Sequence, residues 1–201
     1  MSNALTRSRL RLNARAPLHS AVVLLVAVVL SGWNAKATEQ QSLAPYVPTP
    51  QDVVERMLLL AEVTKDDVVY DLGCGDGRIV ITAAQRYGAR GVGVDIDPRR
   101  IEESIANATA AGVERLVEFR LQDAMTVDVS PATVVTLYLL SSSNAKLRPM
   151  LSRQLRPGAR IVAHAFSMGS DWPADKTEQF TSVDGNQTTL YLWRTDGKVR
   201  P

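Results

Sequence analysis

The 201-residue sequence predicts an α/β protein with a doubly wound, mostly parallel sheet of seven strands. Three observations support this prediction. Short runs rich in β-branched residues alternate with helical segments along most of the chain, which is typical of a parallel sheet covered by helices. A glycine-rich stretch joins one of these strands to the next helix. The last two strand-like runs follow each other without a helix, so they predict a C-terminal antiparallel hairpin.

Residues 1–37 have the composition of a targeting segment. They contain five basic and no acidic residues, and an uncharged apolar run at 21–30 precedes a small-x-small sequence at 35–37. This order predicts a secretory signal peptide, or a membrane anchor if the apolar stretch extends over residues 16–33. A buried N-terminal helix is the alternative. The arginines before the apolar run predict that the body is exported to the periplasmic side, although a cytoplasmic face stays open.

The rest of the chain is weakly acidic. It contains 18 basic and 21 acidic residues, a net charge of −3, which argues against a broad nucleic-acid-binding face. Cys74 is the only cysteine of the chain, and His19 and His164 are its only histidines. The sequence therefore predicts no internal disulfide, no metal site and no histidine-centred triad.

Residues 38–48 are polar and then proline-rich, so we predict a linker there and a folded domain over 49–201. Thr49 can cap a first helix that has Pro50 at its first position and apolar residues at helical spacing. The same reasoning predicts later helices at 78–87, 98–111 and 144–155. Strands are predicted at 68–72, 91–94, 117–121, 133–140, 159–165, 177–183 and 188–194. The turn residues Asp184-Gly185-Asn186 join the last two strands.

The segment Asp71–Gly77 follows the first strand and opens a helix, which is where doubly wound folds bind their ligands. A dinucleotide site requires G-x-G-x-x-G, but the third-glycine position counted from Gly73 is Arg78. The observed spacing is D-x-G-x-G-x-G. An acidic residue just before the glycines suits a ligand with a cationic amino group and no pyrophosphate. S-adenosylmethionine (SAM) has such a group and a positive sulfonium centre.

The next two strands also end in acidic residues. Asp95 lies about 20 positions after the glycines, the spacing at which a carboxylate binds ribose in doubly wound folds, and it can accept bonds from both ribose hydroxyls. Gln122 and Asp123 follow the third strand, where a side chain can reach an adenine edge. The alternative is that these are ordinary turn and cap residues, and Asp97 is the better cap for the helix at 98. Three successive strand ends with an acidic group nevertheless predict one pocket.

Several stretches resemble known proteins: residues 45–50, 69–80, 91–98, 133–140 and 155–164. Through them the chain resembles the seven-strand SAM-dependent methyltransferases over roughly residues 45–195. It is more closely similar to small bacterial relatives of the mitochondrial lysine methyltransferases that modify the c-subunit of ATP synthase and the adenine nucleotide translocase.

The resemblance implies a role for each motif residue. Asp71 and the three loop glycines would hold the methionine part of SAM, Asp95 the ribose and Asp123 the adenine. Residues 46–50 would fold over the cofactor. The full set expected to bind the cofactor is Thr49, Asp71, Gly73, Gly75, Gly77, Asp95, Ile96, Gln122 and Asp123.

Methyl transfer from SAM requires mainly that the two reactants be positioned and water excluded. An attacking lysine must be neutral, but no catalytic base is obligatory and the sequence identifies none. Tyr46, Thr49 and Tyr138 are candidates near the cofactor, although Tyr138 in an apolar strand also fits a core position. His164, in the fifth strand, fits a structural role.

The fourth strand ends in Tyr138-Leu139-Leu140-Ser141. It lacks the Asn-Pro-Pro-Tyr sequence of many DNA and glutamine amine methyltransferases, which argues against those acceptors. We therefore expect a monomeric methyltransferase that acts on a protein, with lysine as the acceptor, and that associates with a membrane through residues 16–33. The alternatives are a small-molecule methyltransferase on the same fold and an exported, non-catalytic protein.

Overall fold

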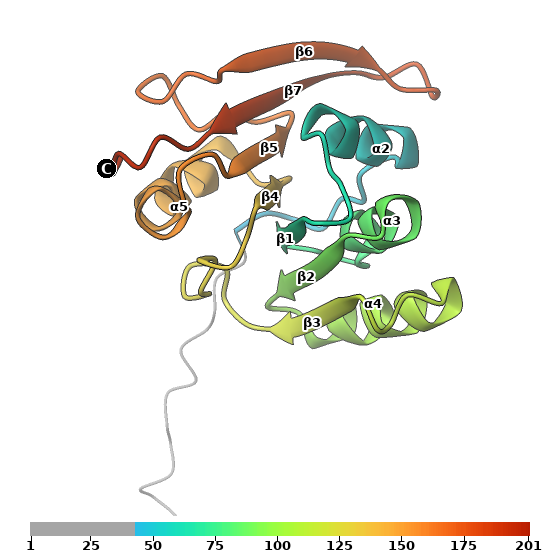
Figure 1. The fold of residues 1–201 in the computed structure, drawn as a ribbon. Coiled ribbons are helices and arrows are strands. Elements are labelled where there is room, and N and C mark those ends of the chain that lie inside the picture. The colour runs from blue at the N-terminus through green and yellow to red at the C-terminus, as the bar shows by residue number, and fades with distance from the viewer. Residues whose placement is uncertain (1–42) are drawn as a thin grey trace, which may run out of the picture. The chain divides into compact units, whose positions relative to one another are not determined.

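The structure is a computed structural model that describes residues 43–201. The predicted leader at 1–37 and the first part of the predicted linker lie outside the described residues. The described chain forms a seven-stranded sheet flanked by helices (Figure 1). The helices are α2 (Gln51–Leu60), α3 (Arg78–Tyr87), α4 (Pro98–Ala111) and α5 (Ser141–Gln154). The strands are β1 (Val68–Leu72), β2 (Arg90–Asp95), β3 (Val117–Leu121), β4 (Val134–Leu137), β5 (Arg160–His164), β6 (Lys176–Thr181) and β7 (Gln187–Arg194).

The strand order is β3-β2-β1-β4-β5-β7-β6. The first five strands are parallel, and β7 is antiparallel to both β5 and β6. This order confirms the predicted doubly wound sheet and its terminal hairpin. The order reverses on either side of β1, because β2 lies beside it in one direction and β4 in the other. Such a switch point leaves a crevice at the carboxyl ends of the strands, where ligands bind in this architecture.

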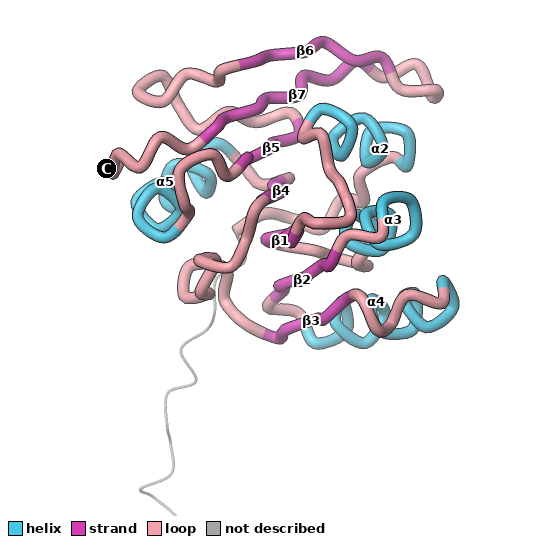
Figure 2. The backbone as a smooth tube through the Cα atoms, in the orientation of Figure 1, coloured by secondary structure: helices cyan, strands magenta, loops and turns pink. Residues whose placement is uncertain are grey.

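Both faces of β1, β2, β4 and β5 are largely buried, which explains their nearly continuous apolar sequences, whereas the edge strand β3 is partly exposed. Successive side chains point to opposite faces. Val69 and Val134 pack toward α2 and α3, whereas Tyr70 and Val135 pack toward α5 and the β3–β4 connection. Figures 1 and 2 show α2, α3 and α4 on one side of the sheet and α5 on the other. Packing on both faces holds the strands, and therefore their carboxyl ends, in fixed positions.

Three local predictions need correction. Pro50, not Thr49, is the N-cap of α2, and no side chain caps that helix; Thr49 is instead buried, and its carbonyl accepts a bond from Arg78. The fourth strand ends at Leu137 rather than at residue 140. Helix α5 consequently begins at Ser141, three residues earlier than predicted. The apolar run misled because its last residues leave the sheet to line the crevice and to start a helix.

The helices of the described chain are short or amphipathic. None of the helices found within 43–201 has the length and apolar character needed to cross a bilayer. The predicted anchor at 16–33 lies outside this part of the chain.

Candidate active site

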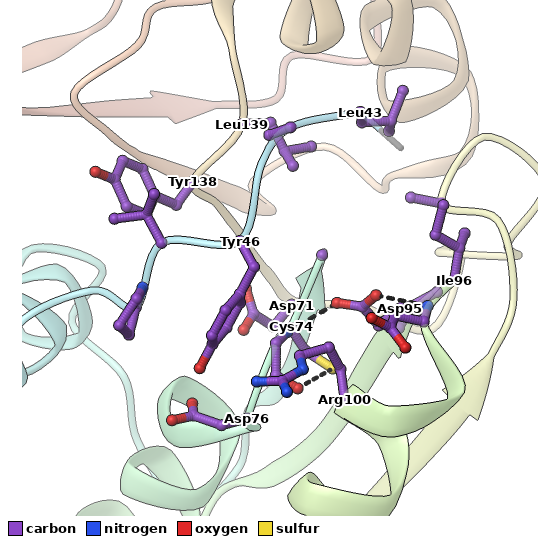
Figure 3. Close-up of a pocket in the computed structure, with 18 of the residues that line it drawn as sticks. Leu43, Tyr46, Asp71, Cys74, Asp76, Asp95, Ile96, Arg100, Tyr138 and Leu139 are labelled. Atoms are coloured by element: carbon purple, nitrogen blue, oxygen red, sulfur yellow. Dashed lines mark hydrogen bonds between the residues drawn. The ribbon is translucent and has the colours of Figure 1, made fainter. Parts of the chain in front are cut away.

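A cavity of about 570 Å³ opens at the carboxyl ends of the parallel strands. Eight of the nine residues expected to bind the cofactor line this cavity, and so do Tyr46 and Tyr138, the candidate catalytic residues (Figure 3). The eight are Thr49, Asp71, Gly73, Gly75, Asp95, Ile96, Gln122 and Asp123. The structure thus brings together residues from four separate segments that the sequence predicted as one site.

Gly77 is the ninth residue, and it does not line the cavity. Its φ is +80°, and a Cβ at this position would lie 2.7 Å from the Phe119 ring and 3.0 Å from Ser104 Cβ. The glycine therefore allows α3 to start against α4 and β3, as the last glycine of such loops does. The structure thus gives Gly77 a packing role, and its predicted contact with the cofactor stays a prediction.

Gly75 has a different constraint. Its φ is +54°, and an added Cβ would lie 2.6 Å from Tyr46 Cε2. The ring of Tyr46 therefore lies directly over the glycine loop. The Gly75 amide also donates a 2.9 Å hydrogen bond to Asp95 Oδ2, so this glycine joins the first and second strand ends.

Asp71 is the most unusual carboxylate of the site. It is 3% exposed, and the Thr136 hydroxyl donates a 2.8 Å bond to its Oδ1. Burial raises the pKa of Asp71 to about 7, and the nearby Asp95 and Asp76 add to this effect. Among residues 43–201 it forms no ion pair. Such a buried carboxylate at a cavity wall suits a cationic amino group. SAM has such a group, and the sequence predicted this contact for Asp71.

Asp95 is held by backbone amides. Its Oδ2 accepts from Gly75, and its Oδ1 accepts a 2.9 Å bond from the Asp97 amide. Each carboxylate oxygen can still accept a further bond, so the predicted contact with two ribose hydroxyls remains available. Asp97 caps α4 by accepting a bond from the Arg99 amide, which confirms the predicted cap.

The third strand end is ordered by its own turn. Asp123 Oδ1 accepts a 2.8 Å bond from the Met125 amide, and Gln122 Nε2 donates to the Thr126 carbonyl at 3.2 Å. Both side chains line the cavity beside Ala124. Their predicted contact with adenine stays a prediction.

Residues 43–49 cross the mouth of the cavity, and we call them the N-terminal strap. The Ser143 hydroxyl donates to the Leu43 carbonyl at one end, and Arg78 Nη1 donates to the Thr49 carbonyl at 2.7 Å at the other. Between these ends the Tyr46 ring lies 4.4 Å from the Arg100 guanidinium. Figure 3 shows Tyr46 pointing from the strap toward Asp76 and Arg100.

The sequence reasoning missed three charged residues of this site. Arg78 binds Asp76, with Nε 2.9 Å from Oδ1, and Arg100 lies under Tyr46. Asp76 sits inside the glycine motif, so its position could have indicated a role. Nothing in the local sequence indicated Arg100, because only the fold brings it to Tyr46.

On the side of the cavity formed by the end of β4, Tyr138 and Leu139 line the wall. Tyr138 follows β4, and its ring centroid lies 3.9 Å from that of His164. His164 is 5% exposed, and burial lowers its pKa to about 4, so the ring is neutral near pH 7. Its position under Tyr138 agrees with the structural role expected for it.

The site can be compared with known proteins. Residues 71–176, slightly more than half of the chain, match the model of a family described as the ANTKMT methyltransferase domain. The chain belongs to this family. It is 46% identical over 151 residues to a protein-lysine N-methyltransferase of Saccharolobus islandicus, covering 74% of this chain and 92% of the relative. It is 30% identical to the ATP synthase C-subunit lysine N-methyltransferase of Xenopus laevis, but spans only 57% of that relative.

A solved structure is also similar to this methyltransferase. It is described as an RNA methyltransferase from Salinibacter ruber in complex with S-adenosyl-L-homocysteine (SAH). The identity is 52%, the TM-score is 0.71, and the match covers 77% of this chain and 97% of the other. The chain is therefore a SAM-dependent methyltransferase, and the buried carboxylate of Asp71 fits that cofactor.

Proposed function

We propose that this methyltransferase transfers methyl groups to the side-chain amines of lysine residues in a protein. The proposal rests mainly on the similarity to the protein-lysine N-methyltransferase of Saccharolobus islandicus, because the match spans nearly the whole of that relative. The absence of an Asn-Pro-Pro-Tyr sequence after β4 agrees with it.

SAM supplies an electrophilic methyl group on a sulfonium, so the protein has to position the reactants rather than activate them. Asp71 would face the cofactor's amino group, and Asp95 would fix the ribose from the neighbouring strand end. Tyr46 and the strap would exclude water from the mouth. We place no general base in the site, because the acceptor amine can lose its proton to solvent before it enters.

RNA is the alternative acceptor, since a 52% identical structure is described as an RNA methyltransferase. Phosphate binding needs free cations. All three arginines that line the cavity are instead paired with carboxylates in the structure. The pairs are Arg78 with Asp76, Arg99 with Asp97 and Arg100 with Glu103. This pairing favours a protein acceptor.

The acceptor class can be tested by incubating the full-length protein with radiolabelled SAM and a cell extract that lacks the endogenous enzyme. We expect label that resists ribonuclease, is lost on proteolysis, and is recovered as methyllysine by mass spectrometry. Label that ribonuclease removes would replace the proposal with an RNA activity. Label only in small molecules would indicate a metabolite acceptor.

Asp95→Ala provides the matched inactive variant. We expect it to abolish SAM binding in calorimetry while the circular dichroism spectrum stays that of the wild type. Asp128→Ala is the control, because Asp128 is exposed and bonds only the Ser130 amide and hydroxyl of its own turn. Wild-type affinity for SAM in Asp95→Ala would remove Asp95 from the site.

We also propose that residues 1–37 direct the protein to a membrane, with 16–33 as the anchor if the leader is retained. The support is the order of basic, apolar and small residues in this segment. SAM is made in the cytosol, so activity favours a cytoplasmic face, whereas the arginines favour export. Reporter fusions at the C-terminus, active only on one side of the membrane, would determine which holds. Recovery of the full-length chain in the soluble cytosolic fraction would refute the membrane proposal.

A further inference from the structure

A second cavity lies at the opposite end of the sheet from the cofactor site. It has a volume of about 750 Å³ and is lined by the amino ends of β1, β2 and β3 and by the turns that lead into β4 and β5. We call it the amino-end cavity. No residue within 43–201 lines both cavities. Because methyl transfer uses the carboxyl ends of the strands, the proposed function gives this second cavity no role.

Arginines dominate the charge of the amino-end cavity. Four of them line it, namely Arg90, Arg115, Arg156 and Arg160. The acidic side chains of the lining are those of Asp67 and Glu118, and each is already paired. Asp67 binds Arg160, and Glu118 binds Arg120, whose Nε lies 2.7 Å from a carboxylate oxygen. The positive charges of the remaining three arginines therefore have no carboxylate partner in the described chain.

This cavity collects most of the unpaired arginines that the structure describes. Within residues 43–201, every arginine forms an ion pair except Arg90, Arg115, Arg153 and Arg156. Three of these four line the amino-end cavity. Like charges that share a cavity repel one another, and a bound anion removes this repulsion. The distribution of unpaired arginines thus points to an anionic ligand.

The backbone holds the three arginines on two sides of the cavity. Arg90 begins β2, and its amide donates a 3.1 Å bond to the Asp67 carbonyl. Arg115 precedes β3, the strand that pairs with β2. Arg156 lies in the turn before β5, where its carbonyl accepts a 3.0 Å bond from the Ala159 amide. Strand β5 is three positions from β2 in the sheet, about 14 Å at the usual strand spacing.

We propose that the amino-end cavity binds a small, soluble ligand with two or more phosphate groups. Arg90 and Arg115 bind one phosphate, and Arg156 binds another across the cavity. A guanidinium group presents a planar set of donors that matches two oxygens of a phosphate, whereas lysine offers a point charge. This site is separate from the site of methyl transfer, and the inference does not depend on which acceptor the enzyme methylates.

The surroundings of the cavity favour a small ligand over an extended polyanion. Asp66 and Glu114 are exposed, and each adjoins a residue of the lining in the sequence. Their carboxylates repel a polyanion that continues past the cavity, such as RNA or the surface of an anionic membrane. A ligand that fits within the cavity meets the arginines without approaching these carboxylates.

The test is a calorimetric titration of inorganic tripolyphosphate into the full-length protein at constant ionic strength. The protein is first saturated with SAH, which fills the cofactor cavity, so the heat reports on binding elsewhere. Arg90→Gln, Arg115→Gln and Arg156→Gln should each weaken tripolyphosphate binding roughly tenfold or more, the value of a lost hydrogen bond between charged groups. Their affinity for SAH and their melting temperatures should stay those of the wild type.

Arg153→Gln is the matched control. It removes the same charge from an exposed arginine in the last turn of α5 that does not line the cavity. Its affinity for tripolyphosphate should change less than about twofold, because salt screens exposed charges that do not touch the ligand. An equal loss in Arg153→Gln would show that net charge alone attracts the anion and would overturn the inference. A wild-type protein that binds no tripolyphosphate would overturn it as well.

A second measurement distinguishes a soluble ligand from a lipid headgroup. The wild type and Arg156→Gln are sedimented with vesicles made of equal parts of phosphatidylcholine and phosphatidate. We expect the two proteins to bind these vesicles equally, since the cavity is not a membrane surface. Vesicle binding that Arg156→Gln abolishes and tripolyphosphate does not compete away would replace the soluble ligand with a lipid.

Discussion

The Thr136 hydroxyl of β4 donates a 2.8 Å hydrogen bond to the buried carboxyl group of Asp71 at the end of β1. This bond crosses the switch point of the sheet and fixes the carboxyl group against the cavity. It compensates only part of the cost of burial, since the pKa of Asp71 is still raised to about 7. Within residues 43–201 the Asp71 carboxylate has no ion-pair partner, and this has consequences for stability and for ligand affinity.

The first prediction concerns pH and Asp71. A folded-state pKa of about 7 lies above the unfolded value of about 4, so the folded state binds this proton more tightly. The contribution of Asp71 to stability is therefore lost as the pH rises from about 4 to about 7. Asp71→Asn should raise the melting temperature of the cofactor-free protein at pH 8 and have little effect at pH 4. A lower melting temperature at pH 8 would contradict the assignment.

The Asp71 carboxyl group should also determine how cofactor binding depends on pH. A cationic amino group favours ionised Asp71, so the affinity for SAM should rise with pH until about 7 and then level off. In Asp71→Asn the affinity should fall by roughly tenfold to a hundredfold, the value of a hydrogen bond to a charged group, and this pH dependence should disappear. Calorimetric titrations at pH 5, 6, 7 and 8 would measure both effects. Thr136→Val, which loses only the hydroxyl, should move the pH dependence upward.

A second prediction concerns the strap. The Tyr46 ring covers Gly75 and lies against the Arg100 guanidinium, so we expect it to slow the loss of ligand from the cavity. Tyr46→Ala should increase the dissociation rate of SAH several-fold, since an exposed cation–π contact contributes about 0.5–1 kcal/mol and the ring also shields the loop. Tyr46→Phe should dissociate at a rate close to that of the wild type. Stopped-flow displacement would measure these rates, and equal rates in all three proteins would exclude Tyr46 as a cover.

A third prediction separates the cost of backbone strain from the cost of steric overlap at Gly77, with Gly112 as the comparison. Gly77 and Gly112 have similar φ values, +80° and +70°, but an added Cβ meets Phe119 at 2.7 Å in the first case and nothing within 4 Å in the second. Gly112→Ala should cost about 1 kcal/mol of folding free energy from strain alone. Gly77→Ala should cost about 2 kcal/mol more, because the core has to shift. Equal losses in urea unfolding would show that Phe119 moves aside freely.

A fourth prediction concerns the ion pair between Asp67 and Arg160 at the amino ends of β1 and β5. Both side chains are largely buried, and Arg160 also donates a 2.7 Å bond to the Ala61 carbonyl. Arg160→Met should destabilise the protein by about 3 kcal/mol, because Asp67 loses its cation. Exposed Arg194→Met, which breaks only a surface pair with Glu62, is the control and should cost less than about 1 kcal/mol.

The loss in Arg160→Met should also depend on pH. Burial raises the pKa of Asp67, but bonds from Thr133, Thr64 and Arg160 outweigh this effect and lower it below its usual value. A lowered pKa contributes stability above the unfolded pKa of about 4, and this is lost as the pH falls through the folded pKa. The difference between wild type and variant should therefore shrink below pH 4. A constant difference in unfolding free energy from pH 3 to pH 7 would contradict this account.

The sequence by itself determined the succession of strands and helices along the chain and the position of the glycine loop between β1 and α3. These are local properties, because the hydrophobic period distinguishes a strand from a helix, and glycine is the residue that most readily adopts left-handed φ values. The sites of Asp71, Asp95 and Asp123 followed, because the carboxyl ends of neighbouring parallel strands meet at one edge of a sheet. The ends of individual helices and strands were predicted less accurately. The apolar run at 133–140 serves a strand, a cavity wall and a helix start, and its composition does not divide them.

Only the tertiary structure decided which residues from distant segments meet. Ser143 holds the strap at Leu43 although the two are 100 positions apart, and Arg100 reaches Tyr46 because α4 starts beside the glycine loop. The pairing of Tyr138 with His164 depends on β4 and β5 being neighbours in register. The raised pKa of Asp71 is likewise a property of burial. Such contacts depend on packing and local dielectric, which sequence patterns do not encode, so they became visible only in the folded chain.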